Sequence, residues 1–319
     1  MPETKRSYHR LRESFEKMAI QIAGNPLARF NLARSGSPRR IFHGGGGIGD
    51  DLLCTTVFHE LKKRGEPRVV MRTFYRDLFQ GNPDVDVVIR KKIPLIAGLM
   101  VHGLNLFQLT YHVPLREHFL ASMCRDAGMT GQVSLRPYIF LRPAETAAGR
   151  IFDRQIVIQS SGLGSNRPMK NKEWYPERFQ AVAGRLHSGG RLIQLGARMD
   201  PPLTGALDLR GKTSLRQAAA ILANSLVFVG QVGFLMHLAR AVDCRSVIIY
   251  GGRETPDKTG YAANQNLIGP TSCSPCWEEN RCDYDRECMK MISAEAVVNA
   301  TTEQIKKHGS PLETEVVEL

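Results

Sequence analysis

Long apolar runs are missing from this chain of 319 residues: none reaches the ~18 residues that a membrane-spanning helix needs. The longest candidate, residues 93–101, is shorter and contains a proline. The first residues also lack the apolar core and the small-residue cleavage site of a secretion signal. These absences argue against a membrane span and against export, so the expected location is the cytoplasm.

Cysteine is scarce, and its distribution is uneven. Seven cysteines is an odd number, which argues against a closed disulfide framework. Three of them, Cys54, Cys124 and Cys244, are isolated and are expected to be small core residues. The other four fall within sixteen residues, at a spacing that suits one tetrahedral metal ion: Cys273, Cys276, Cys282 and Cys288. Four thiolates leave no open position, so the spacing predicts a structural zinc site, with iron or four free thiols as the alternatives.

Acidic residues are outnumbered, with 43 Lys and Arg against 31 Asp and Glu and a net charge of +12. Such a balance favours anionic partners: nucleic acid, phosphorylated small molecules or an acidic membrane face. The basic residues form no run of five or more, and no signature of RNA or DNA binding accompanies them. We therefore expect no nucleic acid as the main partner, and a nucleic-acid binder remains only as an alternative hypothesis.

A basic leader, residues 1–38, precedes the rest of the chain. Within it, residues 8–23 have the apolar spacing of an amphipathic helix, with basic side chains on the other face. Two interpretations are open: the helix packs on the protein, or it makes peripheral contact with the anionic inner membrane.

From residue 39 onward, short apolar strands alternate with helical periodicity. The expected strands are at 40–43, 68–71, 85–89, 138–141, 156–159, 191–195, 207–209, 226–229 and 246–250, and helices at 51–64, 176–187, 214–224 and 236–242. This α/β alternation predicts doubly wound parallel sheets with crossover helices. We expect two Rossmann-like domains, 39–148 and 149–305, that face across a cleft, a linker near 142–152, and a flexible tail, 306–319. Ligands of such folds bind at the carboxyl ends of the strands.

Glycine is concentrated in the loop 44–50, which leaves a strand and enters a helix. Gly47 and Gly49 let the backbone approach a ligand, and the helix N-terminus favours an anion. The loop is not a P-loop, because no Gly-Lys-Ser/Thr follows it. Asp50 and Asp51 have two interpretations: carboxylates that complement the helix dipole, or a general base at the cleft.

Further polar residues stand at the ends of strands in the second half. Ser160 and Ser161 could donate hydrogen bonds to phosphate or cap a turn, and Lys172 could bind phosphate or be solvated. His237 follows the strand-to-helix junction at Gly233 and is either a ligand of a diphosphate or a packing residue.

These pieces, taken in order, resemble glycosyltransferase family 9, the ADP-heptose:lipopolysaccharide heptosyltransferase family. The resemblance runs from about residue 40 to 300, and its parts are the Gly-Asp loop at 44–50, Lys172 with Trp174, the Leu-Arg-Gly-Lys-Thr-Ser-Leu box at 209–215, the Met236-His237 pair and the cysteine cluster. It implies the GT-B fold, with the nucleotide sugar mainly on the C-terminal domain and the acceptor mainly on the N-terminal one. It also implies an inverting reaction whose chemical step needs no metal.

The resemblance assigns roles to particular residues. Asp50 matches the general base, and Lys172 matches the lysine on the donor diphosphate. The remaining substrate-binding positions that we expect are Gly47, Gly49, Asp51, Ser160, Ser161, Gly233, Met236, His237 and Glu254. The implied partners are a nucleoside-diphosphate sugar and a glycan, glycolipid or protein acceptor in lipopolysaccharide or related biosynthesis. Protein-modifying heptosyltransferases similar to this family carry an iron-binding cysteine finger.

One position departs from the family pattern. Where family members carry an acid before the Met-His pair, this chain has Val232, within the stretch that begins at Gln231. The departure puts ADP-heptose in doubt as the donor and motivates a second hypothesis, a non-catalytic module that binds a nucleotide sugar or a metal. Glu254 could keep an acidic contact with the donor.

Overall fold

The computed structural model describes residues 41–90, 106–111, 113–187 and 189–319. The predicted basic leader, 1–38, with its helix at 8–23, lies outside these residues, as does the apolar run at 93–101. Within the described part of the chain, no helix combines the length and the apolar character needed to cross a membrane.

The N-terminal domain is built on a parallel sheet in the order β3-β2-β1-β4. Its strands are short: β1 (Ile41–His43), β2 (Val70–Thr73), β3 (Val87–Arg90) and β4 (Leu106–Gln108). The two central strands, β1 and β2, are mostly buried, whereas Val87, Val88 and Ile89 of β3 are partly exposed. The helical elements of this domain are α3 (Ile48–Lys63), η1 (Arg76–Phe79) and α5 (Phe119–Asp126). The long helix α3 follows β1 directly, and its Leu52, Leu53 and Phe58 are buried against the sheet.

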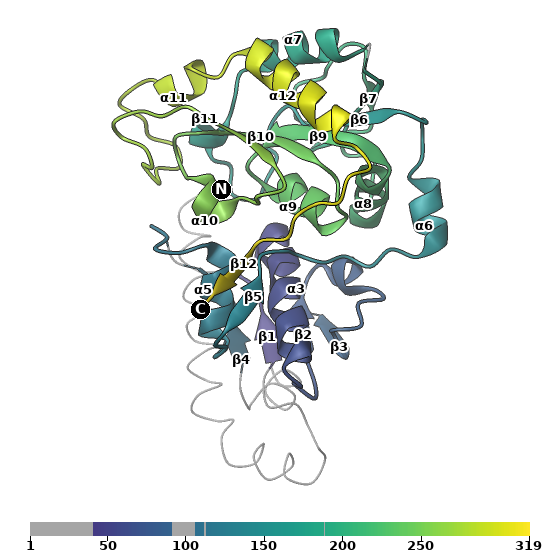
Figure 1. Ribbon diagram of the computed structural model, residues 1–319, viewed down its shortest axis with the longest axis vertical. Coiled ribbons are helices and arrows are strands. Elements are labelled where there is room, and N and C mark those ends of the chain that lie inside the picture. The colour runs from purple at the N-terminus through teal and green to yellow at the C-terminus, as the bar shows by residue number, and fades with distance from the viewer. Residues whose placement is uncertain (1–40, 91–105, 112, 188) are drawn as a thin grey trace, which may run out of the picture.

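The C-terminal domain contains a six-stranded parallel sheet in the order β11-β10-β9-β6-β7-β8. The strands are β6 (Gln155–Ile158), β7 (Arg191–Gln194), β8 (Leu207–Asp208), β9 (Ser225–Gln231), β10 (Ser246–Gly251) and β11 (Gln265–Ile268). Its helical elements are η2 (Lys170–Lys172), α7 (Pro176–Leu186), α8 (Leu215–Ala223), α9 (Phe234–Ala241), α10 (Pro256–Thr259), α11 (Glu287–Lys290) and α12 (Ala294–Lys306). The two sheets lie in separate halves of the molecule, as Figure 1 shows.

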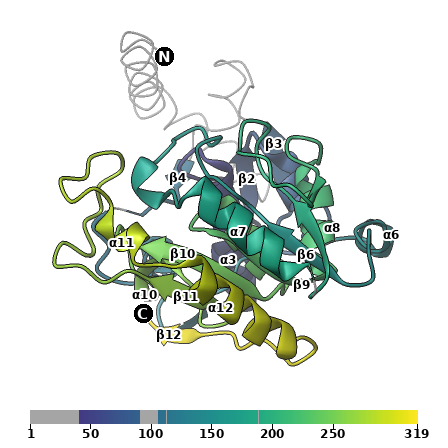
Figure 2. The ribbon, with the colours of Figure 1, turned by 90° about the horizontal axis from the view of Figure 1, so that it is seen from above.

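Both faces of this sheet are covered. Successive side chains of β9 point to opposite faces and all of them are buried, so each face must pack against other elements. Val227 and Val229 point to the cluster that contains Phe179 of α7 and Val297 of α12. Phe228 points to the opposite cluster, which includes residues of α8 and α9 and continues into the N-terminal domain. Figure 2 shows α7 and α12 together over one face. The doubly wound α/β class with two parallel-sheet domains is therefore confirmed.

The chain connects the two domains twice. The outward passage runs through an extended segment and α6 (Pro143–Ala148), inside the predicted linker. The return passage follows α12, where β12 (Val316–Glu318) pairs antiparallel with β5 (Gln132–Ser134) of the N-terminal domain. Figure 1 shows this C-terminal strand beside β5. The segment predicted as a flexible tail, 306–319, thus contains a paired strand.

A second difference concerns residues 138–141, where the sequence predicts a strand. The alternation of apolar side chains is present, but this segment has no strand partner. Its main chain bonds instead to side chains: Tyr138 N donates to Thr55 Oγ1 at 2.8 Å, and Phe140 O accepts from Arg216 at 2.8 Å.

Candidate functional site

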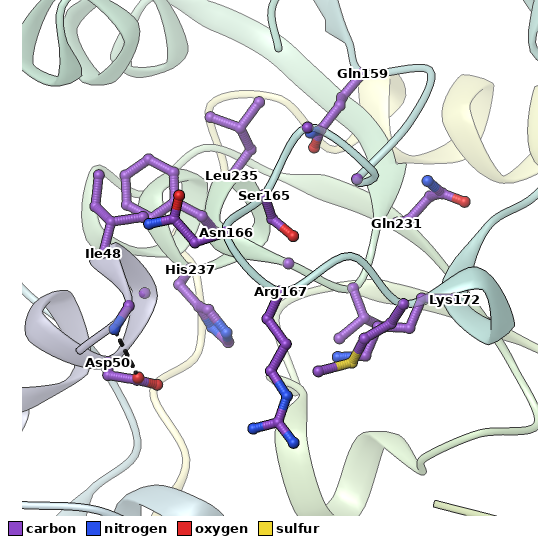
Figure 3. A pocket seen from close by; sticks show the side chains of 18 of the residues that line it. Ile48, Asp50, Gln159, Ser165, Asn166, Arg167, Lys172, Gln231, Leu235 and His237 are labelled. Atoms are coloured by element: carbon purple, nitrogen blue, oxygen red, sulfur yellow. Dashed lines mark hydrogen bonds between the residues drawn. The ribbon is translucent and has the colours of Figure 1, made fainter. Parts of the chain in front are cut away.

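A cavity of about 1070 Å³ lies between the two domains. Its walls come from the loops that follow the strands of both sheets, including 45–50 after β1, Tyr111 after β4, 159–173 after β6 and Arg253 after β10. This is the edge of a parallel sheet where ligands of α/β proteins bind. Figure 3 shows Asp50, Arg167, Lys172 and His237 among the side chains that line it.

Asp50 lies in the first turn of α3, which the glycine loop brings to the cavity. Its Oδ2 accepts the Gly47 N–H at 3.1 Å, and Tyr111 donates its hydroxyl to Oδ1 at 3.5 Å. A Cβ at Gly45 would come within 2.7 Å of Asp50 Oδ2, so this position leaves no room for a side chain. Burial raises the pKa of Asp50, although these hydrogen bonds and the charges of Arg167 and Lys172 lower it in part. A half-buried carboxylate with a raised pKa, at the wall of a cavity, is suited to accept a proton.

Lys172 reaches the cavity from the 3₁₀ turn η2 on the other side. Its Nζ lies 2.5 Å from Glu254 Oε1, and Arg253 donates to the same oxygen at 3.2 Å. Glu254 is only 4% exposed, and burial opposes its ionisation, yet Lys172 and Arg253 hold its pKa below the usual value. Glu254 therefore stays ionised and fixes the position of the lysine.

Ser161 and Ser160, adjacent in sequence, occupy different environments. Ser161 lines the cavity and donates to Glu173 Oε2 at 2.7 Å, while Gly162 N donates to Oε1 of the same carboxylate at 2.7 Å. Ser160 is fully buried, donates to Pro201 O at 2.6 Å and does not line the cavity. Ser161 is therefore the serine that can contact a ligand directly.

His237 lies in the first turn of α9 and lines the cavity. Its Nδ1 is 2.7 Å from the hydroxyl of Tyr261, and burial lowers its pKa to about 3. The imidazole is therefore neutral at physiological pH and can donate or accept one hydrogen bond but adds no charge.

The remaining predicted residues divide into two groups. Gly47, Gly49 and Gly233 line the cavity, together with Val232 at the position of the family acid. Asp51 and Met236 do not line it. Asp51 accepts a hydrogen bond from the Thr73 hydroxyl, and the buried Met236 accepts one at its Sδ from the Tyr250 hydroxyl.

Several lining residues had not been singled out from the sequence. These are Tyr75, Tyr111, Arg167, Glu173, Asp200, Arg253, Trp277 and Glu279. Asp200 is 2% exposed, and burial raises its pKa to about 6. Only Arg253 and Asp200 carried a signal, because each follows a predicted strand, and polar residues at strand ends are expected to face ligands.

The four clustered cysteines lie in one excursion after β11. Cys282 Sγ accepts the N–H of Arg286 at 3.3 Å. Burial is the main cause that raises the pKa of the Cys288 thiol, and the nearby Cys282 and Cys276 raise it further. Among the residues that the structure describes, no three His, Cys, Asp or Glu side chains converge closely enough to hold a metal ion.

Solved structures share this fold over most of the chain. Escherichia coli ADP-heptose lps heptosyltransferase II has 15% identity and a TM-score of 0.65, covering 84% of this chain and 99% of that one. A glycosyl transferase family 9 structure from Veillonella parvula DSM 2008 has 15% identity and a TM-score of 0.62, covering 84% and 97%. The bacterial iron-containing dodecameric glycosyltransferase TibC from enterotoxigenic E. coli H10407 has 17% identity and a TM-score of 0.67, covering 85% and 76%.

These likenesses, at such low identity, establish the GT-B arrangement of the two domains. No curated protein matches the sequence. A family model does match: residues 141–284, a little under half of the chain, fit Glycosyltransferase family 9 (heptosyltransferase). The match spans η2, the part of the cavity wall that comes from the C-terminal domain, and most of the cysteine excursion. It confirms the predicted resemblance to glycosyltransferase family 9 over these residues.

Proposed function

We propose that the protein transfers a sugar from a nucleoside-diphosphate sugar to an acceptor hydroxyl, with Asp50 as the general base. The observation that carries the proposal is the position of Asp50 in the cavity wall opposite Lys172, with its pKa raised by burial. A titratable group perturbed by burial in an interdomain cleft is typical of catalytic sites.

The proposed step is a single displacement at the anomeric carbon. The acceptor oxygen forms the new C–O bond as its proton passes to Asp50, and the bond from the anomeric carbon to the diphosphate oxygen breaks. The electron pair leaves with the nucleoside diphosphate, whose growing charge Lys172 would stabilise. Attack from the face opposite the leaving group inverts the anomeric configuration.

The donor that we propose first is ADP-heptose, because a TibC structure is described as a complex with ADP-D-beta-D-heptose. Val232 provides no charge where the family has an acid, so Glu254, which pairs with Lys172, would supply the acidic contact. We propose a glycan, glycolipid or protein as the acceptor.

We further propose one structural metal ion, iron or zinc, on Cys273, Cys276, Cys282 and Cys288. Four soft sulfur donors within sixteen residues suit either ion. Cys276 and Cys282 act electrostatically on the Cys288 thiol, and the ion would draw the four thiols together from their more open arrangement in the described residues. Elemental analysis of the purified protein tests this: about one ion per chain, lost in a Cys276→Ser/Cys282→Ser variant, is expected. Metal-free protein of native fold would contradict it.

The test of catalysis combines binding and turnover. A thermal-shift panel of ADP, GDP, UDP, CDP and dTDP should reveal one selective ligand, since a ligand at 100 times its Kd stabilises by about 2.7 kcal/mol. The corresponding nucleotide sugar is then assayed for transfer with Asp50→Asn and with Glu117→Gln, a control at a partly exposed carboxylate outside the cavity. We expect Asp50→Asn to lose ~10²- to 10⁴-fold in kcat and to retain the thermal shift. Unchanged turnover in Asp50→Asn would refute its role as the base.

A further inference from the structure

The loop that carries the predicted donor lysine is held from outside by the cysteine excursion. We call residues 160–173 the donor loop and residues 271–288 the cysteine segment. Lys170 N donates to Asn280 Oδ1 at 3.0 Å, and Asn171 N donates to Glu279 O at 3.0 Å. Arg286 of the cysteine segment contacts the same loop, and its guanidinium donates a hydrogen bond to Glu173 O at 3.0 Å. These bonds join the main chain of η2 to a segment more than a hundred residues away.

Asn171 is the central residue of this contact. Its side chain is 5% exposed and stands directly before Lys172. Its amide nitrogen donates to Glu278 O at 3.1 Å and to Arg281 O at 2.7 Å, so both of its N–H groups are used on the cysteine segment. A buried amide with two directed bonds fixes the orientation of the turn to which it belongs.

The same few residues of the cysteine segment hold the other cationic side chains of the cavity. Arg167 forms an ion pair with Glu279. Arg253 donates from Nε to Glu278 O at 3.1 Å and lies 5.9 Å from the ring centre of Trp277. Lys172 follows Asn171 in the same turn. Figure 3 shows Arg167 and Lys172 extending into the cavity.

We infer that the cysteine segment sets the phosphate-binding geometry of the cavity, with Asn171 as the positioning residue that transmits it. The inference rests on the proposed function, because it assumes that Lys172 meets a diphosphate. The segment then acts on the donor through Lys172, Arg167 and Arg253 together. Loosening the segment should therefore weaken the hold on the diphosphate and leave the affinity for a nucleoside without phosphates unchanged.

The test replaces Asn171 by Asp, which keeps the size of the side chain but places a carboxylate against two carbonyl oxygens. Gln180→Ala is the matched control, since Gln180 also exchanges side-chain hydrogen bonds with a backbone, that of Thr204, away from the cavity. Titration calorimetry compares ADP with adenosine as probes. We expect Asn171→Asp to bind ADP about tenfold more weakly and adenosine equally well, and Gln180→Ala to change neither.

Hydrogen exchange gives a second readout that needs no ligand. Asn171→Asp and Asn280→Ala, which breaks the contact from the opposite side, should both accelerate exchange in peptides covering 162–173. The double variant should add little to either single one, because both loosen the same contact region between the donor loop and the cysteine segment. Unchanged exchange in both variants, or faster exchange with unaltered ADP affinity, overturns the inference. If the parent chain binds no nucleotide, the proposed donor class fails, while the exchange data still decide whether the segment holds the loop.

Discussion

At the scale of single residues, the carboxylates on the two sides of the cavity have pKa values shifted in opposite directions. Asp50 is half-buried, with hydrogen bonds but without a direct ion-pair partner among the interactions described for it, and its desolvation raises its pKa. Glu254 is buried but lies between Lys172 and Arg253, which lower its pKa. One carboxylate is therefore held ready to take up a proton, and the other is held as a permanent anion.

Asp50→Asn should make the protein more stable at neutral pH. A folded-state pKa above the usual 3.8 means that the native state holds this proton more tightly, so the stabilisation is complete at low pH and is lost as pH rises through the raised value. At pH 7 the ionised carboxylate is a cost that the amide avoids. Thermal denaturation should show a higher Tm for Asp50→Asn at pH 7 and a smaller difference near pH 4. A lower Tm at pH 7 would contradict this account.

The activity profile should respond to the same group. Because a general base must be ionised, kcat should fall on the acid side with an inflection above the ordinary aspartate pKa of 3.8, following the raised pKa of Asp50. His237, whose pKa is about 3, should contribute no inflection between pH 5 and 8. Measured pH–rate profiles of the parent and of His237→Gln would check both statements, and an inflection near pH 6.5 that vanishes in His237→Gln would refute the second.

Lys172→Met should destabilise the fold as well as remove the diphosphate contact. It leaves Glu254 with Arg253 alone in a buried site, and breaking a buried ion pair costs roughly 3 kcal/mol. The double variant Lys172→Met/Glu254→Gln should recover most of the stability but not the nucleotide binding. Urea denaturation and nucleotide titration of the three proteins separate these effects. Recovery of binding in the double variant would show that Lys172 does not contact the donor.

The family resemblance pointed to Asp50, Lys172 and His237, whereas the local sequence pattern alone left each of them with a second interpretation. It could not place Ser160 and Ser161 on different sides of their loop, since that depends on Pro201 and Glu173 folding back against them. The partners of Asn171 lie 107 and 110 positions away, so no local signal reveals that it is tied to the cysteine segment.

At the scale of elements, the sequence predicts which strands and helices are buried and how they alternate. It does not predict which distant segments pair with each other. Helix α3 begins three residues before the predicted start, because Gly47 and Asp50 close its first turn. Strand β12 pairs with β5 across most of the chain length, which a polar C-terminal sequence cannot reveal. Residues 138–141 have strand periodicity without a sheet neighbour, because side chains of Thr55 and Arg216 occupy their main-chain groups.

The contact between α5 and α10 should make the fold sensitive to acid. His118, which caps α5, is 2.8 Å from Gly260 O through Nε2, and burial lowers its pKa to about 4. A depressed histidine pKa gives stability that is present above 6.5 and lost as pH falls towards 4, by up to ~1.4 kcal/mol per pH unit. Urea denaturation at pH 7 and 5 should show this loss, and His118→Gln should reduce it. An equal loss in both proteins would exclude His118 as its source.

At the scale of the whole molecule, Arg216 of α8 connects the domains through its entire guanidinium. It forms two bonds to Glu145 of α6, at 2.7 and 2.6 Å, and others to the carbonyl oxygens of Asp77, Gln80 and Phe140. The planar fork of arginine suits this set, and a lysine cannot reproduce it. The guanidinium also holds the pKa of Glu145 well below its usual range.

Replacing Arg216 by Lys or Ala should therefore lower the Tm by several degrees, with Ala the more severe. Arg142→Ala is the matched control, since Arg142 contacts the same carboxylate but is 67% exposed and should matter little. Calorimetry of the three variants gives the comparison. Equal effects of Arg142→Ala and Arg216→Ala would show that the Glu145 contact, and not the bridge to the N-terminal carbonyls, is what stabilises the molecule.

The double passage of the chain between domains has a mechanical consequence. Two domains joined by one flexible linker can rotate relative to each other about three axes. A second connection at a different point suppresses the twisting rotation and one of the two bending rotations. Here α6 and the pairing of β12 with β5 are the two attachments. These two attachments should favour rotation of the domains about the line through both, and a single angle would then describe how far the cleft opens.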